Sequence, residues 1–422
     1  MADITFPLDI PDVIILETAI NEQGDYIITV ESTWQSTQCR KCGREINQFH
    51  GYDEWITLRH LSILGRRVYI KLQPKRYRCP YCDDGPTTTQ QLEWYNARSG
   101  QTIAYEKHLL LQLVNSTVSD VSHKEAIGYD AVVGVLNRYI DAEIDWDSLD
   151  ELGTIGVDEI ALHKGRKSYV AVITNQQEDG QVVLLGVLPD RKKETVRAFF
   201  EGIPARLRST IHAVCTDMWE AYTNAVREYA AAHADVTLAV VVDRFHVARQ
   251  YRHAIDQLRK RVCRDLKKTL PKADYEDIKH VMWACRQNHA TLTAAERLKL
   301  LRLFELAPDF KLAYPLREEL TAIFELPLSK DQAAHRLRKW QAKVERSGLT
   351  CFDVFLKTLA NWLDEITNYF VRRLTSGFVE GFNNRLKTLK RRCYGLSLDH
   401  LFRRLRLDLS GYRRFAPAHM QG

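Results

Sequence analysis

The chain has 422 residues, a length sufficient for several domains with substantial cores. Of these residues 45% are hydrophobic and 27% are charged, which is typical of a soluble protein. It contains no run of 18 apolar residues, and its acidic N-terminal segment lacks the basic region of a secretory signal, so we expect a cytosolic protein without a membrane span. The net charge of +6 is unevenly distributed: residues 246–422 hold 35 Lys/Arg against 19 Asp/Glu, and the rest holds 25 against 35. We interpret the basic half as a surface for a nucleic acid rather than as solvated helix faces.

The N-terminal region predicts a β-rich module. Residues 11–33 have the pattern of a β-hairpin, in which NEQG forms the turn between VIILETAI and DYIITVES. Two CxxC pairs follow, each after a short strand candidate: Cys39, Cys42, Cys79 and Cys82. Four thiolates in paired spacing predict a structural Zn²⁺ site, which is closed and therefore not catalytic. Arg76 and Arg78, in the basic run before the second pair, are candidate DNA contacts.

Residues 100–142 have helical apolar spacing. Within them, residues 117–140 predict a helix-turn-helix with its turn around Ile127-Gly128-Tyr129. Such a motif places its second helix in the major groove of DNA, and Arg138 is a candidate contact. The alternative is an ordinary pair of antiparallel helices, since the second helix carries few basic residues.

Residues 153–245 alternate between strand and helix patterns in the order β-β-β-α-β-α-β. Three closely spaced strands predict an antiparallel meander, and the later crossovers predict parallel strands, as in a ribonuclease-H-like α/β core. Asp158 lies in the first strand run, and Asp217 directly follows the fourth. Beside Asp217, we favour core packing for Trp219 and Tyr222 over stacking on a DNA base.

Residues 246–372 have an almost wholly helical pattern, with breaks expected at Pro271, Pro308, Pro315 and Pro327. Glu380 then lies in or beside a helix. Two carboxylates from neighbouring strands and a third from a covering helix are what a pair of Mg²⁺ or Mn²⁺ ions requires for phosphoryl transfer, so Asp158, Asp217 and Glu380 are the candidate catalytic ligands. Asp243, after the fifth strand run, is an alternative ligand or a neighbour of the ligands, and we interpret His246 as a packing or hydrogen-bonding residue.

The segment after Glu380 is strongly basic. Cations and amides beside a carboxylate site neutralise and position the DNA backbone. The candidate DNA-binding residues of this segment are Asn384, Arg385, Lys387, Lys390, Arg391 and Arg392. The alternative is a solvated helix face.

Several segments resemble the ISL-three family of bacterial insertion-sequence transposases. They are RYRCPYC, GVDEIALHKGRKSYVAVITN, CTDMWEAY, VVVDRFHVAR and VEGFNNRLKTLKRRCYG. The resemblance implies a DDE triad of Asp158, Asp217 and Glu380, each binding Mg²⁺. It also implies that the helical block is an insertion into the catalytic core, and that the zinc and helix-turn-helix modules bind terminal inverted repeats.

These observations predict a DNA transposase that cleaves insertion-sequence ends and joins them to target DNA in a Mg²⁺-dependent reaction. A homodimer on paired ends is expected, in the bacterial cytoplasm and at the nucleoid when bound to DNA. The alternatives are a catalytically silent zinc and helix-turn-helix regulator, or a structure-selective nuclease. The expected division is a zinc module (1–95), a helix-turn-helix domain (96–148), the first part of the core (149–245), an all-α insertion (246–372) and the completion of the core with a basic tail (373–422).

Overall fold

The computed structural model describes residues 8–161, 169–177, 180–375, 377–393 and 397–417. It divides into two compact units, which are described separately below. The first unit comprises Met1–Asp141 together with Arg406–Gly422, and the second comprises Ala142–Leu405. None of the helices in the described part of the chain is long and apolar enough to cross a membrane.

The first unit begins with the predicted hairpin. Strand β1 (Val13–Ile20) pairs antiparallel with β2 (Tyr26–Ser32), which confirms the prediction for this segment. Strands β7 (Arg66–Leu72) and β6 (Ile56–Ile63) extend the sheet in the order β1-β2-β7-β6. Alternate side chains of β7, including Val68 and Ile70, are fully buried against Trp94, so the sheet has one packed face.

The cysteine pairs follow short strands, as predicted. β3 (Thr37–Gln38) precedes Cys39 and pairs with β4 (Glu45–Ile46). β8 (Lys75–Arg78) precedes Cys79 and lies between β5 (Gln48–Tyr52) and β9 (Thr87–Thr89). The local apolar core is small, since only Cys39, Ile46, Tyr77 and Cys79 are buried in it.

Three helices follow in the first unit: α1 (Ile103–Leu113), α2 (Val118–Glu125) and α3 (Tyr129–Tyr139). The turn between α2 and α3 contains Ala126 in the left-handed conformation, which confirms the predicted helix–turn–helix arrangement. Leu407 and Phe415, from the last part of α15 (Leu398–Phe415), pack into the same core. The segment 143–152, between these helices and the next strand, contains one 3₁₀ turn at Trp146–Ser148.

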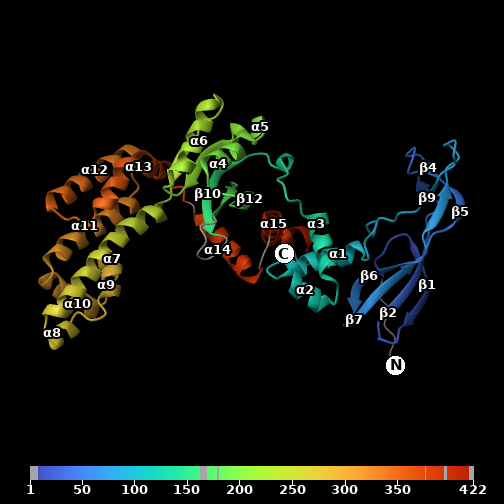
Figure 1. Cartoon of the computed structure of the whole chain (residues 1–422), viewed down its shortest axis with the longest axis horizontal. Helices are drawn as coiled ribbons and strands as arrows, with labels where there is room; N and C mark the ends of the chain where they lie inside the picture. The colour runs from blue at the N-terminus through green and yellow to red at the C-terminus, as the bar shows by residue number, and fades with distance from the viewer. Residues whose placement is uncertain (1–7, 162–168, 178–179, 376, 394–396, 418–422) are drawn as a thin grey trace. The chain divides into compact units, whose positions relative to one another are not determined.

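The second unit contains a five-stranded sheet (Figure 1). Its spatial order is β12 (Val182–Leu188), β11 (Tyr169–Gln176), β10 (Gly153–Ala161), β13 (Ile211–Thr216) and β14 (Ala239–Val242). The pairs β10–β11 and β11–β12 are antiparallel, whereas β10–β13 and β13–β14 are parallel. The predicted meander followed by parallel strands is therefore confirmed.

Helices complete the sheet's packing. α4 (Lys193–Glu201) and α6 (Glu220–Ala232) supply Val196, Phe200, Tyr222 and Tyr229 to a core that also contains Ile155, Val157 and Val214 from the sheet. A short helix, α5 (Ala205–Arg208), was not predicted. α14 (Gly377–Arg392) contacts β10 and brings the C-terminal part of the unit to the strand that carries Asp158.

The helical block predicted for residues 246–372 is present. Its long helices are α7 (Arg244–Thr269), α10 (Ala294–Leu306), α11 (Pro308–Glu325), α12 (Lys330–Ser347) and α13 (Asp353–Arg372), with short helices α8 (Lys272–Glu276) and α9 (Met282–Arg286). Trp340 and Phe310 are fully buried in its core. The break expected at Pro315 is wrong, because this proline lies inside α11; Pro308, by contrast, begins that helix, where its missing N–H costs nothing.

Candidate functional site

Two of the three predicted catalytic carboxylates lie on neighbouring parallel strands. Val157 of β10 is paired with Thr216 of β13, so the next residues along each strand, Asp158 and Asp217, fall at the same edge of the sheet. Burial, and then the charge of Asp158, raises the pKa of Asp217 to about 6. Burial likewise raises the pKa of Asp158. Folding therefore places two acidic groups close enough to repel each other in a poorly solvated position.

The hydrogen bonds of this pair leave room for a cation. Asp158 accepts the N–H of Glu159 at 2.7 Å on Oδ1 and the Nδ2 amide of Asn383 at 2.5 Å on Oδ2. Oδ1 of Asp217 is buried and accepts no hydrogen bond from any described residue. A buried, unpartnered carboxylate oxygen beside a second carboxylate has the oxygen chemistry and the negative charge that Mg²⁺ or Mn²⁺ binds.

Helix α14 contributes Asn383 to the site. Phe382, Leu386 and Leu389 are buried on the same helix and hold it in place, and Asn383 is only 4% exposed. Asn383 is not among the candidate residues that the sequence pattern indicates. Its helical spacing relative to the three apolar residues is the sequence signal that could have predicted its position on the packed face. Glu380 also lies in α14, three residues before Asn383, but its side chain is outside the described part of the structure.

Asp243 begins α7 at the end of β14, next to the strand that carries Asp217. Its carboxylate accepts the N–H of Phe245 at 3.0 Å and caps the helix, and its own N–H donates to the carbonyl of Thr216 at 3.1 Å. This capping bond satisfies one carboxylate oxygen in a way that is independent of a metal. His246, in the first turn of α7, offsets part of the effect of burial and lowers the pKa of both Asp158 and Asp217.

Arg191 contacts residues that follow closely after the two aspartates in the chain, in a cluster that the sequence did not reveal. Arg191 donates to Glu159 at 2.7 Å and stacks on Trp219 and Tyr169, with 4.3 and 4.4 Å from the guanidinium carbon to the ring centroids. Tyr222 is fully buried, as predicted, but core packing is wrong for Trp219, which is 39% exposed. The partners of Arg191 come from three separate segments of the chain, so no local sequence pattern could predict these contacts.

The four paired cysteines form one cluster. Their four Sγ atoms all lie within 4.8 Å of one another; the residues are Cys39, Cys42, Cys79 and Cys82. The Sγ of Cys79 lies 3.7 Å from that of Cys42 and 3.6 Å from that of Cys82. Four Zn–S bonds of about 2.3 Å in a tetrahedron require separations of about 3.8 Å, so the residues fit zinc. The backbone N–H groups of Cys42 and Lys41 lower the pKa of Cys39 to about 6, which favours the thiolate.

The candidate DNA contacts of the first unit have different surroundings. Arg78 is exposed, and Arg76 donates to the hydroxyl of Thr87 at 2.8 Å. Arg138 forms an ion pair with Glu106, a fully buried carboxylate that also accepts from the hydroxyl of Tyr139 at 2.7 Å. Arg138 thus links α3 to α1 through an ion pair, so its guanidinium is only partly available for a DNA contact.

The candidate contacts on α14 are mostly accessible. Asn384, Arg385, Lys387, Arg391 and Arg392 are all exposed. The side chain of Lys390 lies outside the described residues. Because these residues follow Asn383 on the same helix, α14 joins a packed face beside Asp158 to a basic, solvent-facing surface.

Comparison with known protein families gives three matches in the order that the sequence predicts. Residues 155–405 match a family model described as a transposase. Residues 90–140 match the helix-turn-helix domain of transposase family ISL3, and residues 35–82 match the zinc finger of the transposases of IS204, IS1001, IS1096 and IS1165. The zinc cluster and the helix-turn-helix described above lie within the latter two ranges, which supports a structural zinc ion and DNA as a partner.

Two relatives are similar over most of the chain. The transposase for insertion sequence element IS1001 of Bordetella parapertussis is 28% identical over 394 residues, which cover 92% of each chain. The transposase for insertion sequence element IS1557 of Mycobacterium tuberculosis is 23% identical over 404 residues, covering 90% of this chain and 87% of the relative.

Proposed function

The chain belongs to the ISL3 family of transposases, and from that premise we propose that it cleaves DNA at the ends of an insertion sequence and joins the freed ends to target DNA. The observation that carries the proposal is a pair of neighbouring carboxylates: Asp158 within β10 and Asp217 directly after β13. Both have raised pKa values, and one oxygen of Asp217 has no partner among the described residues. Such a pair beside a basic helix suits a reaction on a phosphodiester. The family match alone would not say which residues act.

We assign the sheet and its helices to a ribonuclease-H-like core. The strand order β12-β11-β10-β13-β14, antiparallel and then parallel, supports this assignment. We propose a division into a zinc module (1–95), a helix-turn-helix domain (96–148), a first part of the core (149–245), a helical insertion (246–372), and a completion of the core with a basic tail (373–422). Within the last range, Arg406–Gly422 is a tail that belongs to the first compact unit.

Asp158, Asp217 and Glu380 would hold Mg²⁺ or Mn²⁺, with Asp243 kept as an alternative. Bound there, the metal supplies Lewis-acid activation of the attacking oxygen and neutralises charge on the phosphate and the leaving oxygen. Asn383 donates to Oδ2 of Asp158 and so fixes the orientation of the carboxylate towards the metal. The cations of α14 and Arg191 hold the DNA backbone against this edge of the sheet.

The reaction has two phosphoryl transfers. In the first, water attacks the phosphodiester at the insertion-sequence end, and the broken P–O bond leaves a 3′-hydroxyl. In the second, that hydroxyl attacks a phosphodiester of the target DNA and displaces a 3′-oxygen there. The zinc and helix-turn-helix modules bind the terminal inverted repeats, and a homodimer holds the two ends together.

Cleavage of a labelled duplex that carries an insertion-sequence end, with Mg²⁺ present, tests the assignment. We expect Glu380→Gln and Asp217→Asn to lower cleavage by at least about a thousandfold while binding is retained, because each variant removes a metal ligand. Glu345→Gln, an exposed residue of α12, serves as the control and should cut normally. Equal cleavage by Glu380→Gln and the unchanged protein would remove Glu380 from the site. Cleavage without any joined product would favour a nuclease.

A further inference from the structure

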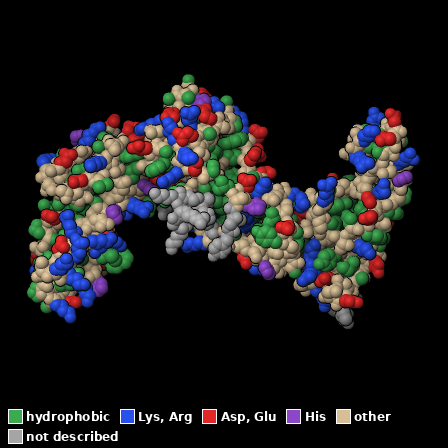
Figure 2. Space-filling model, viewed as in Figure 1, with side chains coloured by type: hydrophobic (Ala, Val, Ile, Leu, Met, Phe, Trp, Pro, Cys, Tyr) green, Lys and Arg blue, Asp and Glu red, His purple; other side chains and the backbone are tan. Residues whose placement is uncertain are grey.

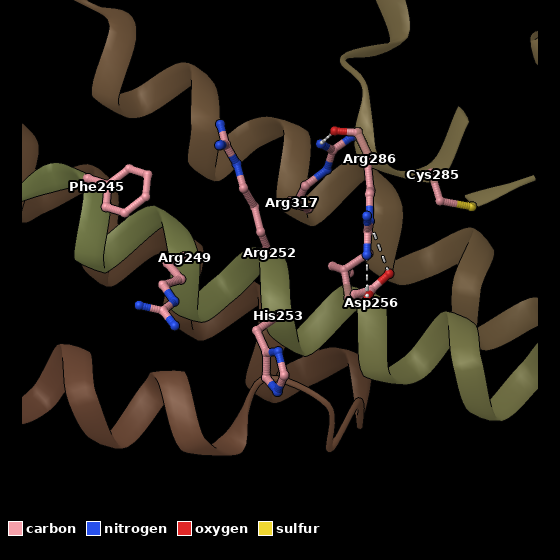
Figure 3. Close-up of a pocket in the computed structure, with 9 residues that line it drawn as sticks. Phe245, Arg249, Arg252, His253, Asp256, Cys285, Arg286 and Arg317 are labelled. Atoms are coloured by element: carbon pink, nitrogen blue, oxygen red, sulfur yellow. Dashed lines mark hydrogen bonds and ion pairs between the residues drawn. The ribbon is translucent and has the colours of Figure 1, made fainter. Parts of the chain in front are cut away.

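The helical block contains a hollow of about 400 Å³ along one face of α7 (Figure 3). Phe245, Arg249, Arg252 and Asp256 line it at intervals of four, three and four residues, which is the spacing of a single helical face. Arg286 and Arg317 line it from other helices. Four arginines against one carboxylate give this hollow a positive charge, and a ligand that suits it is an anion.

The cations that face the hollow are of two kinds. Arg249 and Arg252 are exposed, and neither forms an ion pair with another described residue. Arg286, in contrast, donates to Asp256 at 3.0 Å, and Arg259 donates to the same carboxylate at 2.9 Å. The negative charge of Asp256 is therefore already neutralised from within the block, which leaves Arg249 and Arg252 for an external partner.

Arg317 adds a buried guanidinium to the wall, and it forms an ion pair with Glu318 at 2.6 Å. It is 1% exposed and donates to the backbone carbonyls of Arg286 at 3.1 Å and Gln287 at 2.7 Å. Its Nε–H is buried and has no acceptor among the described residues. A buried donor without an acceptor is costly unless a ligand or water supplies one, and here it belongs to a residue that lines the hollow.

The position of α7 connects the hollow to the aspartates. The helix starts directly after Asp243, and His246 in its first turn acts electrostatically on both Asp158 and Asp217. Arg252 is six residues beyond His246, or about 9 Å along the helix axis. This corresponds to between two and three nucleotides of a DNA strand. The basic character is not confined to these residues, since α7 carries nine Lys/Arg and two Asp, and Figure 2 shows Lys and Arg side chains gathered over this part of the block.

We propose that this face of α7 is a DNA-backbone site, in which Arg249 and Arg252 bind consecutive phosphates and Phe245 stacks on an unpaired base. Phe245 is 50% exposed at the edge of the hollow, so its ring is accessible for stacking on a base. Only the location beside the cleaved bond rests on the proposed function. The binding of phosphodiesters by the hollow does not.

The test measures binding by the full-length protein in the absence of divalent cations, so it does not depend on cleavage. The probe is a fluorescent 30-base-pair duplex of random sequence with a ten-nucleotide single-stranded overhang. We expect Arg249→Ala/Arg252→Ala to weaken binding about tenfold at 100 mM salt and to reduce the slope of log Kd against log salt by about 2, since two phosphate contacts are lost. Arg336→Ala/Arg338→Ala removes two exposed arginines of α12 outside the hollow and is the matched control.

Equal affinities and slopes for the two double variants would overturn the proposal, whatever either variant does in cleavage. The base contact has its own test, because Phe245→Ala should weaken binding of the overhang probe about fivefold or more and leave a blunt duplex unaffected. Loss on both probes alike would show that Phe245 acts through the backbone or the helix and not by stacking. If the arginine variant loses binding while no protein cleaves DNA, the site stands and the proposed function fails.

Discussion

At the scale of single residues, the site depends on a carboxylate held where it is poorly solvated. Asp217 has one buried oxygen without a partner and a neighbouring carboxylate in Asp158. In the absence of a cation, both features oppose ionisation. The proposed role in metal binding requires Asp217 to be ionised, whereas the fold alone disfavours its ionised form. A substitution can therefore separate the effect on stability from the effect on cleavage.

We expect Asp217→Asn to stabilise the metal-free protein at neutral pH. The folded-state pKa of about 6 exceeds the ordinary value of 3.8, so the folded state binds more protons and the free energy of unfolding falls as pH rises between these values. Above pH 6 the full penalty, about 3 kcal/mol, is present, and the amide removes it. Calorimetry should show a melting temperature about 5 °C higher at pH 7.5 and a gain of only about 1 °C near pH 4, where about 0.5 kcal/mol of the penalty is present. A gain that is the same at both pH values would contradict this origin.

Asn383 is predicted to set the pH dependence of cleavage through Asp158. Burial raises the pKa of Asp158, and the amide of Asn383 partly offsets this increase by donating to the carboxylate. Asn383→Ala should therefore raise that pKa further and move the acid limb of the cleavage–pH profile to higher pH. Asn384→Ala, at the exposed neighbouring position, is the control and should weaken DNA binding without moving the profile. Unshifted profiles for both variants would reduce Asn383 to a packing residue.

At the scale of helices and strands, the sequence predicted what repeats locally and missed what depends on distant partners. The strand alternation around Asp158 and the CxxC spacing at Cys39 were sufficient to predict the sheet and the zinc cluster. The contact between Asn383 and Asp158 joins positions 225 residues apart, and Arg191 stacks on rings from two other segments. Pro315 was predicted to end a helix, but packing across α11 outweighed the loss of one hydrogen bond.

The zinc module is expected to lose its structure when the metal is removed. Its local core consists of only four buried residues, two of which are cysteines of the cluster, so apolar burial is too small to replace the metal. Cys39→Ser should abolish the binding of one Zn²⁺ per chain in a chelator titration and make residues 35–90 sensitive to protease. Cys263→Ser, in α7 and away from the cluster, should bind zinc normally. Protease resistance of the metal-free protein would show that the strands hold without zinc.

At the scale of the whole molecule, the proposed DNA contacts are of two kinds and lie in separate units. The zinc cluster and the helix-turn-helix belong to the unit that includes Met1–Asp141, and the aspartates, α7 and α14 belong to the unit Ala142–Leu405. The excess of basic over acidic residues lies in the C-terminal half. Phosphate contacts supply affinity without sequence information, whereas groove contacts discriminate between sequences. We therefore expect the two units to contribute differently to specificity.

This division predicts opposite effects on the ratio of affinities for two duplexes of equal length, one carrying the insertion-sequence end and one with the same bases in scrambled order. Arg249→Ala/Arg252→Ala should weaken both complexes by a similar factor and leave the ratio unchanged, because its contacts are with phosphates. Cys39→Ser should weaken the complex with the insertion-sequence end most and reduce the ratio by about tenfold or more, because each lost base contact costs about 1–3 kcal/mol of discrimination. Measurements at two salt concentrations separate the effects, since only the arginine variant should change the salt slope markedly. If Cys39→Ser weakens both duplexes equally, sequence recognition would have to lie in the helix-turn-helix or in the unit Ala142–Leu405, and the zinc module would serve as a further backbone contact.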